Sequence, residues 1–284
     1  MIISYILGGL GNQLFQYAAG RRIAEKYGTE LKLDMSDFKD YNIRSFDLVK
    51  FNTRFEIAAD SEIQNLKPVG NVAKALQYLE PKFKRTYHRE RFFHYDKRFE
   101  KIGPESYLKG YFQSEKYFAP IADVIRKDFV VDKQHLSEVI RLTPTLRNEK
   151  SVSVHVRRGD YTGVQGSDLF SALPVEYYST AIEMINRKIK DPEFYFFSDD
   201  MEWVKKNLAV KNATYISGIH STNHIEDFYL MSQCRHNIIA NSSFSWWCAW
   251  LNDNPDKIVI APQQWFIKGR QHIDDRLPSA WLKI

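Results

Sequence analysis

Residues 155–161, HVRRGDY, bring together the side chains of this chain that are best suited to binding an anion. They begin at the end of a predicted strand, 152–156. Side chains alternate along a strand, so His155 and Arg157 face one side and Arg158 the other. Two arginines at a strand end, beside a glycine, can clamp a diphosphate through fork-like hydrogen bonds. The alternative is that the arginines pair with nearby carboxylates such as Asp160.

A glycine-rich turn, GGLGNQ at 8–13, follows the first apolar run of the chain. Glycines let the backbone approach a ligand closely, and the helix that follows offers N–H donors to an anion. The turn nearly matches a dinucleotide fingerprint, with Asp34 where a ribose-binding acid would stand, but Leu14 replaces the third glycine. A nicotinamide or flavin site and a plain tight turn are therefore the alternatives.

Two further groups of polar residues follow predicted strands. Asp199 and Asp200 come after the run 194–197, where carboxylates could bind a metal, ribose or guanine, or cap the next helix. A metal site is weakly supported, because the pattern is not Asp-x-Asp. The segment NSSFSWW, 241–247, opens a helix with hydroxyl and amide groups that either cap it or hold a phosphate. Its tryptophans are expected in the core.

Strands that alternate with helices predict two parallel sheets to position these groups. In such sheets ligands bind beyond the carboxyl ends of the strands, where the polar groups lie. The first segment is a strand-turn-helix-strand unit with a strand at 2–7, a helix at 12–27 ended by Gly28, and a strand at 30–34. The second is a Rossmann-like domain with strands at 152–156, 194–197, 214–216, 237–240 and 257–260 and helices at 174–189, 201–208, 224–234 and 244–251. A linker is expected at 143–150.

Composition excludes several classes of protein. The 284 residues are 44% hydrophobic and 26% charged, with 13 Gly, 10 Pro and 2 Cys, which excludes disordered, collagen-like and disulfide-scaffold chains. The formal net charge is +5, with a basic stretch at 82–98, and 14% of residues are aromatic, which suits a core and also a carbohydrate-binding cleft. Cys234 and Cys248 are expected to be buried free thiols.

No apolar run is long enough to span a membrane, and residues 1–7 lack the basic start and cleavage site of a secretory signal. We therefore expect a cytoplasmic protein, with peripheral association at the inner membrane face left open. The oligomeric state is also open.

Five motifs together resemble the bacterial α-1,2-fucosyltransferases of glycosyltransferase family 11. They are GGLGNQLFQYAAG (8–20), GYFQSEKYF (110–118), HVRRGDY (155–161), FFSDD (196–200) and SSFSWWCAWL (242–251). The resemblance implies an α/β fold of GT-B type, two Rossmann-like lobes with a cleft between them. Residues 1–145 would form the acceptor-side lobe and 146–284 the GDP-sugar-binding lobe.

The resemblance also implies a reaction: inverting transfer of L-fucose from GDP-L-fucose to the 2-hydroxyl of a terminal galactose, with no metal and no other cofactor. Arg157 would bind the β-phosphate and neutralise the leaving GDP, with His155 close to the diphosphate or the fucose. The remaining donor-binding residues would be Gly11, Asn12, Gln13, Arg158, Asp199, Asp200, Ser242, Ser243 and Phe244.

The general base is a separate question. A carboxylate in reach of the acceptor hydroxyl could take its proton, and Asp160 is the candidate here. In α-1,6-fucosyltransferases a glutamate is implied ten residues beyond the motif histidine, but Gln165 stands there. A dissociative reaction with the GDP phosphate as base is the alternative.

Two other functions fit parts of the sequence. A nicotinamide-dependent oxidoreductase would use the glycine-rich turn at 8–13. A non-catalytic sugar- or nucleic-acid-binding protein would use the basic aromatic stretch at 82–98, although no nucleic-acid partner is expected for the transferase.

Overall fold

The computed structural model describes residues 1–39, 45–68, 70–136, 138–159, 171–266 and 275–284. The chain forms two compact units. Unit 1 contains Met1–Val130 and Gln271–Pro278, and unit 2 contains Val131–Arg270 and Ser279–Ile284. Each unit has its own parallel sheet, so the prediction of two Rossmann-like lobes is confirmed.

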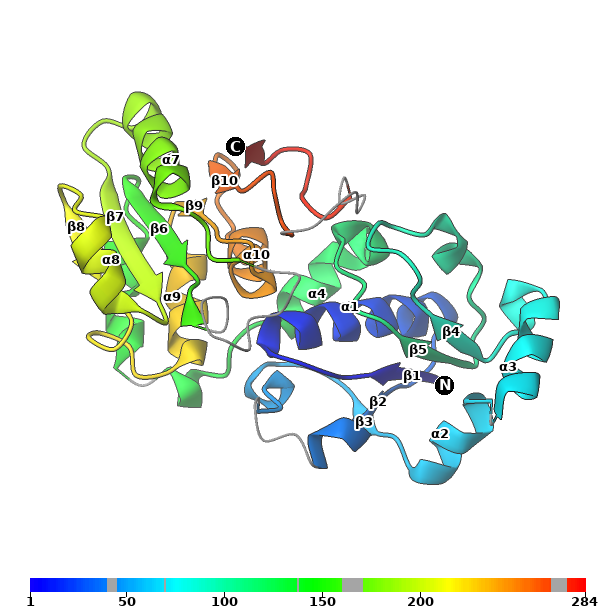
Figure 1. Cartoon of the computed structure of the whole chain (residues 1–284). Helices are drawn as coiled ribbons and strands as arrows, with labels where there is room; N and C mark the ends of the chain where they lie inside the picture. The colour runs from blue at the N-terminus through cyan, green and yellow to red at the C-terminus, as the bar shows by residue number, and fades with distance from the viewer. Residues whose placement is uncertain (40–44, 69, 137, 160–170, 267–274) are drawn as a thin grey trace. The chain divides into compact units, whose positions relative to one another are not determined.

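Unit 1 is built on a five-stranded sheet of order β3-β2-β1-β5-β4, in which all pairs are parallel. Helix α1 packs along β1 and β2 (Figure 1). The elements of unit 1 are β1 Ile2–Tyr5, α1 Leu10–Tyr27, β2 Leu31–Asp34, β3 Glu56–Ile57, α2 Asp60–Leu66, α3 Gly70–Leu79, β4 Tyr87–Arg89, β5 Ser106–Lys109 and α4 Ala122–Asp128.

The strand-helix-strand unit predicted at the N-terminus is present. Strand β1 is completely buried, as its apolar residues require. Helix α1 is capped at its C-terminus by Gly28, which has a left-handed φ of 59°. Glycine adopts this conformation at little energetic cost because it has no Cβ. The helix begins at Leu10, two residues before the predicted start, so the glycine-rich turn runs into its first turn.

Unit 2 is built on a six-stranded parallel sheet of order β11-β10-β9-β6-β7-β8. Numbered from the first strand of the unit, this is the doubly wound order 3-2-1-4-5-6 of dinucleotide-binding folds. The elements are α5 Thr143–Leu146, β6 Ser151–Val156, α7 Val175–Lys188, β7 Glu193–Ser198, α8 Met201–Asn207, β8 Ala213–Tyr215, α9 His224–Gln233, β9 His236–Ile238, α10 Ser243–Leu251, β10 Val259–Ala261 and β11 Leu282–Lys283.

The five strands and four helices predicted for this segment are confirmed, and β11 adds a sixth strand. Its two residues are too few to show a hydrophobic pattern, so the sequence did not reveal it. Trp246 and Trp247 are fully buried, as predicted for the core. Cys234 and Cys248 are buried free thiols, also as predicted.

The predicted linker at 143–150 contains the short helix α5, which lies within unit 2. Among the helices of the described residues, none is long and apolar enough to cross a membrane.

Candidate active site

The sheet of unit 2 has its switch point between β6 and β9. The chain runs from β6 outward through β7 to β8, and then returns to place β9 on the other side of β6. Ligands of open α/β sheets bind at such a point, beyond the carboxyl ends of the strands. The residues that follow β6, β7 and β9 are therefore brought to one edge of the sheet, and these are the polar groups that the sequence singled out.

Two arginine–aspartate pairs join the ends of β6 and β7. In the register of these strands Val156 lies beside Ser198, so the two arginines after β6 lie beside the two aspartates after β7. Arg157 Nη1 lies 2.7 Å from Asp199 Oδ2. Arg158 Nε lies 3.1 Å from Asp200 Oδ2. Ion pairing of the two arginines was one alternative left open by the sequence. The partners in the structure, Asp199 and Asp200, directly follow the neighbouring strand β7.

Asp199 also fixes the backbone after β6. Its carboxylate accepts hydrogen bonds from the backbone N–H of Arg158 at 2.9 Å and of Gly159 at 3.1 Å. A Cβ at Gly159 would lie 2.8 Å from Asp199 Oδ2, so a side chain there would push the carboxylate away. Asp199 thus holds both the guanidinium of Arg157 and the turn that carries it.

Arg158 and Asp200 have additional partners of their own. The guanidinium carbon of Arg158 lies 4.0 Å from the centre of the Trp203 ring, a cation–π contact. Asp200 Oδ1 accepts from the backbone N–H of Trp203 at 3.1 Å and so caps helix α8. Helix capping, one of the alternatives for this pair of aspartates, therefore applies to Asp200. Trp203 is partly buried against the core of unit 2. The sequence did not reveal its contact with Arg158, because a tryptophan in the first turn of a helix is most simply interpreted as a core residue.

His155 is the buried polar residue at the end of β6. It is 6% exposed, and its ring lies 5.6 Å from the ring of Phe244. Burial, reinforced by the positive charge of Arg157, lowers the pKa of His155 to about 3, so the ring is neutral near pH 7. Its Nδ1 is buried and has no hydrogen-bond partner among the described residues. Buried nitrogen atoms are rarely left in this state, so a ligand or a water is expected there.

The loop between β9 and α10 lies next to the end of β6, on the opposite side from β7. Ser242 caps helix α10 by accepting from the N–H of Phe244 at 3.3 Å. Ser243 and Phe244 form the first turn of α10 and are partly buried. Asn241 Nδ2 donates to the carbonyls of Ser171, at 3.1 Å, and Trp265, at 3.3 Å, which fixes two neighbouring segments. The contact of Phe244 with His155 brings this loop and β6 together.

Unit 1 has its own switch point, between β1 and β5. Here Gln113 Nε2 donates to Asn12 Oδ1 at 2.7 Å, which joins the turn after β1 to the loop after β5. Arg276 Nη1 in turn donates to Gln113 Oε1. Gln113 lies in the motif GYFQSEKYF, but the sequence alone assigned it no role of its own. Arg276 gave no signal, because it is 163 positions away along the chain.

Gln13 supports the turn of unit 1 structurally. It is 0% exposed, and its Nε2 donates to the carbonyls of Gly8 and Ser45, each at 2.8 Å. Its Oε1 accepts from the N–H of Asp47 at 2.9 Å. Both of its N–H donors are therefore used within the protein. Gly11, in the first turn of α1, is buried as well.

The dinucleotide alternative finds no support at Asp34. This residue is 1% exposed, and its carboxylate accepts from the Tyr107 hydroxyl at 2.6 Å and from the Ser36 N–H at 2.9 Å. A ribose would have to displace these bonds.

Asp160, the candidate general base, lies outside the described residues, as does Gln165. In the part of the chain that is described, no group of three His, Cys, Asp or Glu residues could hold a metal ion.

Comparison with known proteins identifies the family. The sequence model of glycosyl transferase family 11 matches residues 1–284. This chain belongs to glycosyl transferase family 11. An α-1,2-colitosyltransferase of Escherichia coli is 32% identical and covers 100% of this chain and 99% of its own length. A galactoside α-(1,2)-fucosyltransferase 1 of Rattus norvegicus is 29% identical over 57% of this chain, which spans 46% of that protein.

The fold is similar to that of a solved fucosyltransferase structure. Fucosyltransferase NodZ from Bradyrhizobium superposes with a TM-score of 0.51 at 12% identity, covering 87% of this chain and 91% of that protein. At this identity the similarity concerns the fold alone. The expected α/β fold of GT-B type, with two Rossmann-like lobes, is thereby confirmed for this family 11 glycosyltransferase.

Proposed function

We propose that this glycosyltransferase transfers L-fucose from GDP-L-fucose to the 2-hydroxyl of a terminal galactose, with inversion at the anomeric carbon and without a metal ion. Family membership supports glycosyl transfer, and the rat relative's name gives the α-(1,2) linkage to a galactoside. A structure of similar fold is that of NodZ soaked with GDP-fucose.

The observation that carries the proposal is the position of Arg157 at the switch point of unit 2. Its guanidinium is held 2.7 Å from Asp199, and 21% of its side chain is exposed. A guanidinium has five N–H donors in a rigid fork, so one arginine can hold a carboxylate and a phosphate at once. The N-terminus of α10 lies across the same switch point, where helix N–H groups favour an anion.

This arrangement places positive charge where the proposed reaction would develop negative charge. The acceptor oxygen forms a bond to C1 of the sugar while the bond from C1 to the β-phosphate oxygen breaks, and GDP leaves with the electron pair. Negative charge therefore grows on the β-phosphate. Arg157 stabilises that charge, and a preorganised donor of this kind contributes about 3–4 kcal/mol to lowering the barrier.

The proton of the acceptor hydroxyl needs a base. Asp160 is the proposed group, with the departing GDP phosphate as the alternative. His155 is a poor base, because burial and Arg157 lower its pKa to about 3. Its buried Nδ1 is instead suited to a hydrogen bond with the donor.

The direct test is release of GDP from GDP-fucose with lactose as acceptor, in buffer containing EDTA. Turnover on a β-galactoside under these conditions supports the proposal. A requirement for manganese would contradict the metal-free reaction, and absence of turnover on every β-galactoside tried would contradict the acceptor. A thermal shift with GDP but not with NAD(H) would separate this function from the oxidoreductase.

The donor sugar needs its own test, because the E. coli relative's name points to colitose. Colitose lacks one ring hydroxyl that fucose has. A site built to bind that hydroxyl discriminates strongly against the sugar without it, by about 10⁴-fold or more, whereas a site that merely accommodates it discriminates weakly. We expect kcat/KM to be higher with GDP-fucose than with GDP-colitose, and the reverse order would reassign the donor.

A further inference from the structure

A cavity of about 410 Å³ lies in unit 1, beside the edge strand β4. This volume falls in the range of small-molecule sites. All of its lining comes from one stretch of chain, residues 81–101, which has no part in the proposed reaction. The lining residues are Pro81, Lys82, Phe83, Arg85, Tyr87, His88, Arg89, Arg91, Asp96, Arg98 and Lys101.

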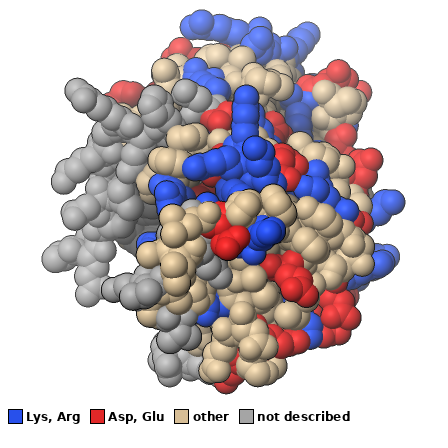
Figure 2. All heavy atoms as spheres, turned by 90° about the vertical axis from the view of Figure 1, so that its right-hand side faces the viewer, with Lys and Arg blue, Asp and Glu red and all other residues tan. Residues whose placement is uncertain are grey.

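The cavity concentrates positive charge. Six Lys or Arg side chains and one carboxylate line it, a surplus of five. The formal net charge of all 284 residues is also +5, so this single cavity holds an excess as large as that of the whole chain. On the face of the molecule shown in Figure 2, Lys and Arg side chains gather near the middle, with acidic side chains around them.

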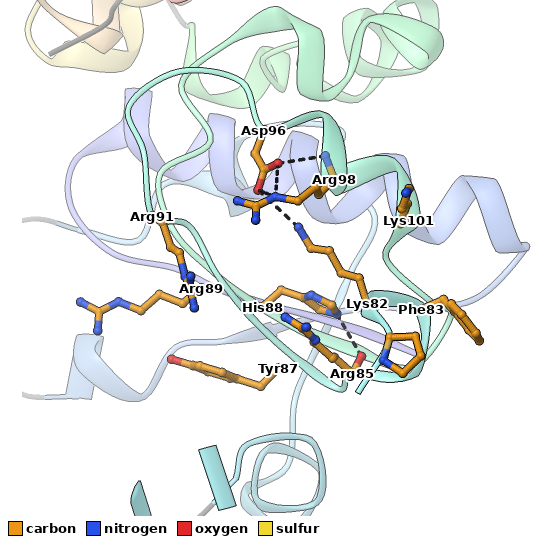
Figure 3. A pocket seen from close by; sticks show the side chains of 11 residues that line it. Lys82, Phe83, Arg85, Tyr87, His88, Arg89, Arg91, Asp96, Arg98 and Lys101 are labelled. Carbon is orange, nitrogen blue, oxygen red and sulfur yellow. Dashed lines mark hydrogen bonds and ion pairs between the residues drawn. The ribbon is translucent and has the colours of Figure 1, made fainter. Parts of the chain in front are cut away.

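The one carboxylate, Asp96, is already neutralised within the lining. Arg98 Nε lies 2.8 Å from Asp96 Oδ1, and Lys82 Nζ lies 3.4 Å from Asp96 Oδ2 (Figure 3). Arg89 and Lys101, in contrast, form no ion pair with a carboxylate of the described residues. The lining therefore holds six cations and a single carboxylate, which is already shared by two of them.

Holding these cations together has an energetic cost. Burial lowers the pKa of Lys82, and repulsion from Arg98 and Arg85 lowers it further. His88 lies at the centre of the lining (Figure 3), with its Nε2 3.0 Å from the carbonyl of Arg85. Charged residues do protect exposed edge strands from pairing. That role requires neither a cavity nor cations crowded enough to perturb one another.

We propose that this cavity binds a phosphate or diphosphate group of a phosphorylated ligand. Arginine forks match phosphate oxygens, and several cations favour an anion that carries more than one charge. The exposed ring of Phe83, 60% accessible, lies in the same lining and offers an apolar surface to the organic part of the ligand. The proposal rests on residues of unit 1 alone and does not depend on the proposed transfer reaction.

Binding of inorganic pyrophosphate to the full chain, measured by titration calorimetry, is the first test. The pocket variant is Arg89→Ala with Lys101→Ala, which removes two cations that lack a described ion-pair partner. The control is Lys188→Ala with Lys190→Ala, which removes the same charge from exposed positions of unit 2. We expect saturable binding that weakens about tenfold or more in the pocket variant and changes little in the control.

Arg157→Ala separates this cavity from the candidate active site. Pyrophosphate binding should persist in that variant. Binding that is lost in Arg157→Ala and kept in the pocket variant would overturn the proposal. Equal weakening in the pocket variant and the control would also overturn it, since that result indicates diffuse electrostatic attraction, as would the absence of saturable binding.

The source of the phosphate is decided by a second measurement. Vesicles of phosphatidylcholine, with and without phosphatidylglycerol, are sedimented with the wild-type chain and the pocket variant. Binding that requires phosphatidylglycerol, is lost in the pocket variant and is reversed by pyrophosphate assigns a lipid headgroup. Saturable pyrophosphate binding without vesicle binding assigns a soluble phosphate ester. Either result supports the cavity as a phosphate site.

Discussion

At the scale of single residues, the candidate active site depends on carboxylates that organise arginines. Asp199 accepts from the guanidinium of Arg157 and from two backbone N–H groups of the following turn. The ion pair fixes the direction in which Arg157 points before any ligand binds. This preorganisation is what makes a charged donor effective at a developing negative charge.

Replacement of Arg157 by alanine should reduce kcat by about 10²–10³-fold, because one preorganised charged donor is lost. The fold should remain, since Asp199 keeps its backbone hydrogen bonds. Steady-state kinetics with GDP-fucose and circular dichroism measure the two effects. Arg157→Lys keeps the charge but loses the fork and should be intermediate. Near-normal turnover of the alanine variant would remove Arg157 from the mechanism.

His88 gives a pH-dependent contribution to stability. Burial lowers its pKa from 6.5 to about 4 in the folded chain, so between these pH values the unfolded chain binds a proton that the folded chain does not. The free energy of unfolding therefore falls as pH falls from 6.5 toward 4. At pH 5 the titration of His88 makes the free energy of unfolding about 1–2 kcal/mol lower than at pH 7. Urea unfolding of wild type and His88→Gln at pH 7 and pH 5 measures it, and the variant should lose less stability. An equal loss in both proteins would exclude His88.

At the scale of elements, the parallel register of β6 and β7 positions the residues of the candidate active site. Strands β6 and β7 pair from Ser151 beside Glu193 to Val156 beside Ser198, so whatever follows each strand lies at the same level. Helix α8 starts directly after β7, and its cap Asp200 also holds Arg158. The start of this helix and the second arginine of the site are thus coupled through one side chain.

Asp200→Ala should lower stability by about 1–2 kcal/mol, because it removes both the cap of α8 and the partner of Arg158. Asp200→Asn is the matched control, since asparagine caps helices about as well as aspartate but carries no charge. Thermal unfolding of the two variants separates the contributions. If both variants lose the same stability, the cap contributes nothing measurable.

At the scale of the whole molecule, the described residues 275–284 are divided between the two units. Arg276 belongs to unit 1 and donates to Gln113, whose amide reaches Asn12. A few residues later β11 pairs with β10 and completes the sheet of unit 2. Trp281, 6% exposed, lies 5.4 Å from Trp246 between ring centres and extends the core beneath α10.

Trp281→Ala should destabilise unit 2 by about 3–5 kcal/mol through the cavity it leaves. Lys283→Ala, two residues later at an exposed position, should have little effect. Chemical unfolding of the two variants measures this difference. Because Trp281 packs against helix α10, Trp281→Ala should also weaken GDP binding. A stable Trp281→Ala variant would show that the C-terminal segment is not part of the core.

The sequence by itself determined the local elements and the residues that end them. Short apolar runs indicated the strands of unit 2, and helical spacing of apolar residues indicated its helices. The polar groups after residues 156, 198 and 240 indicated the edge of the sheet at which the candidate active site lies. These signals are read within short windows, because side-chain periodicity is a local property of the backbone. The motifs also indicated the family, which the match over residues 1–284 confirms.

Only the tertiary structure decided which of those residues meet. Arg158 and Asp200 are 42 positions apart, and Arg276 is 163 positions from Gln113. Contacts at such separations depend on strand order and register, which local patterns do not encode. The same holds for the basic stretch after residue 81: its charge was evident in the sequence, but the cavity forms only when the segments before and after edge strand β4 fold around it.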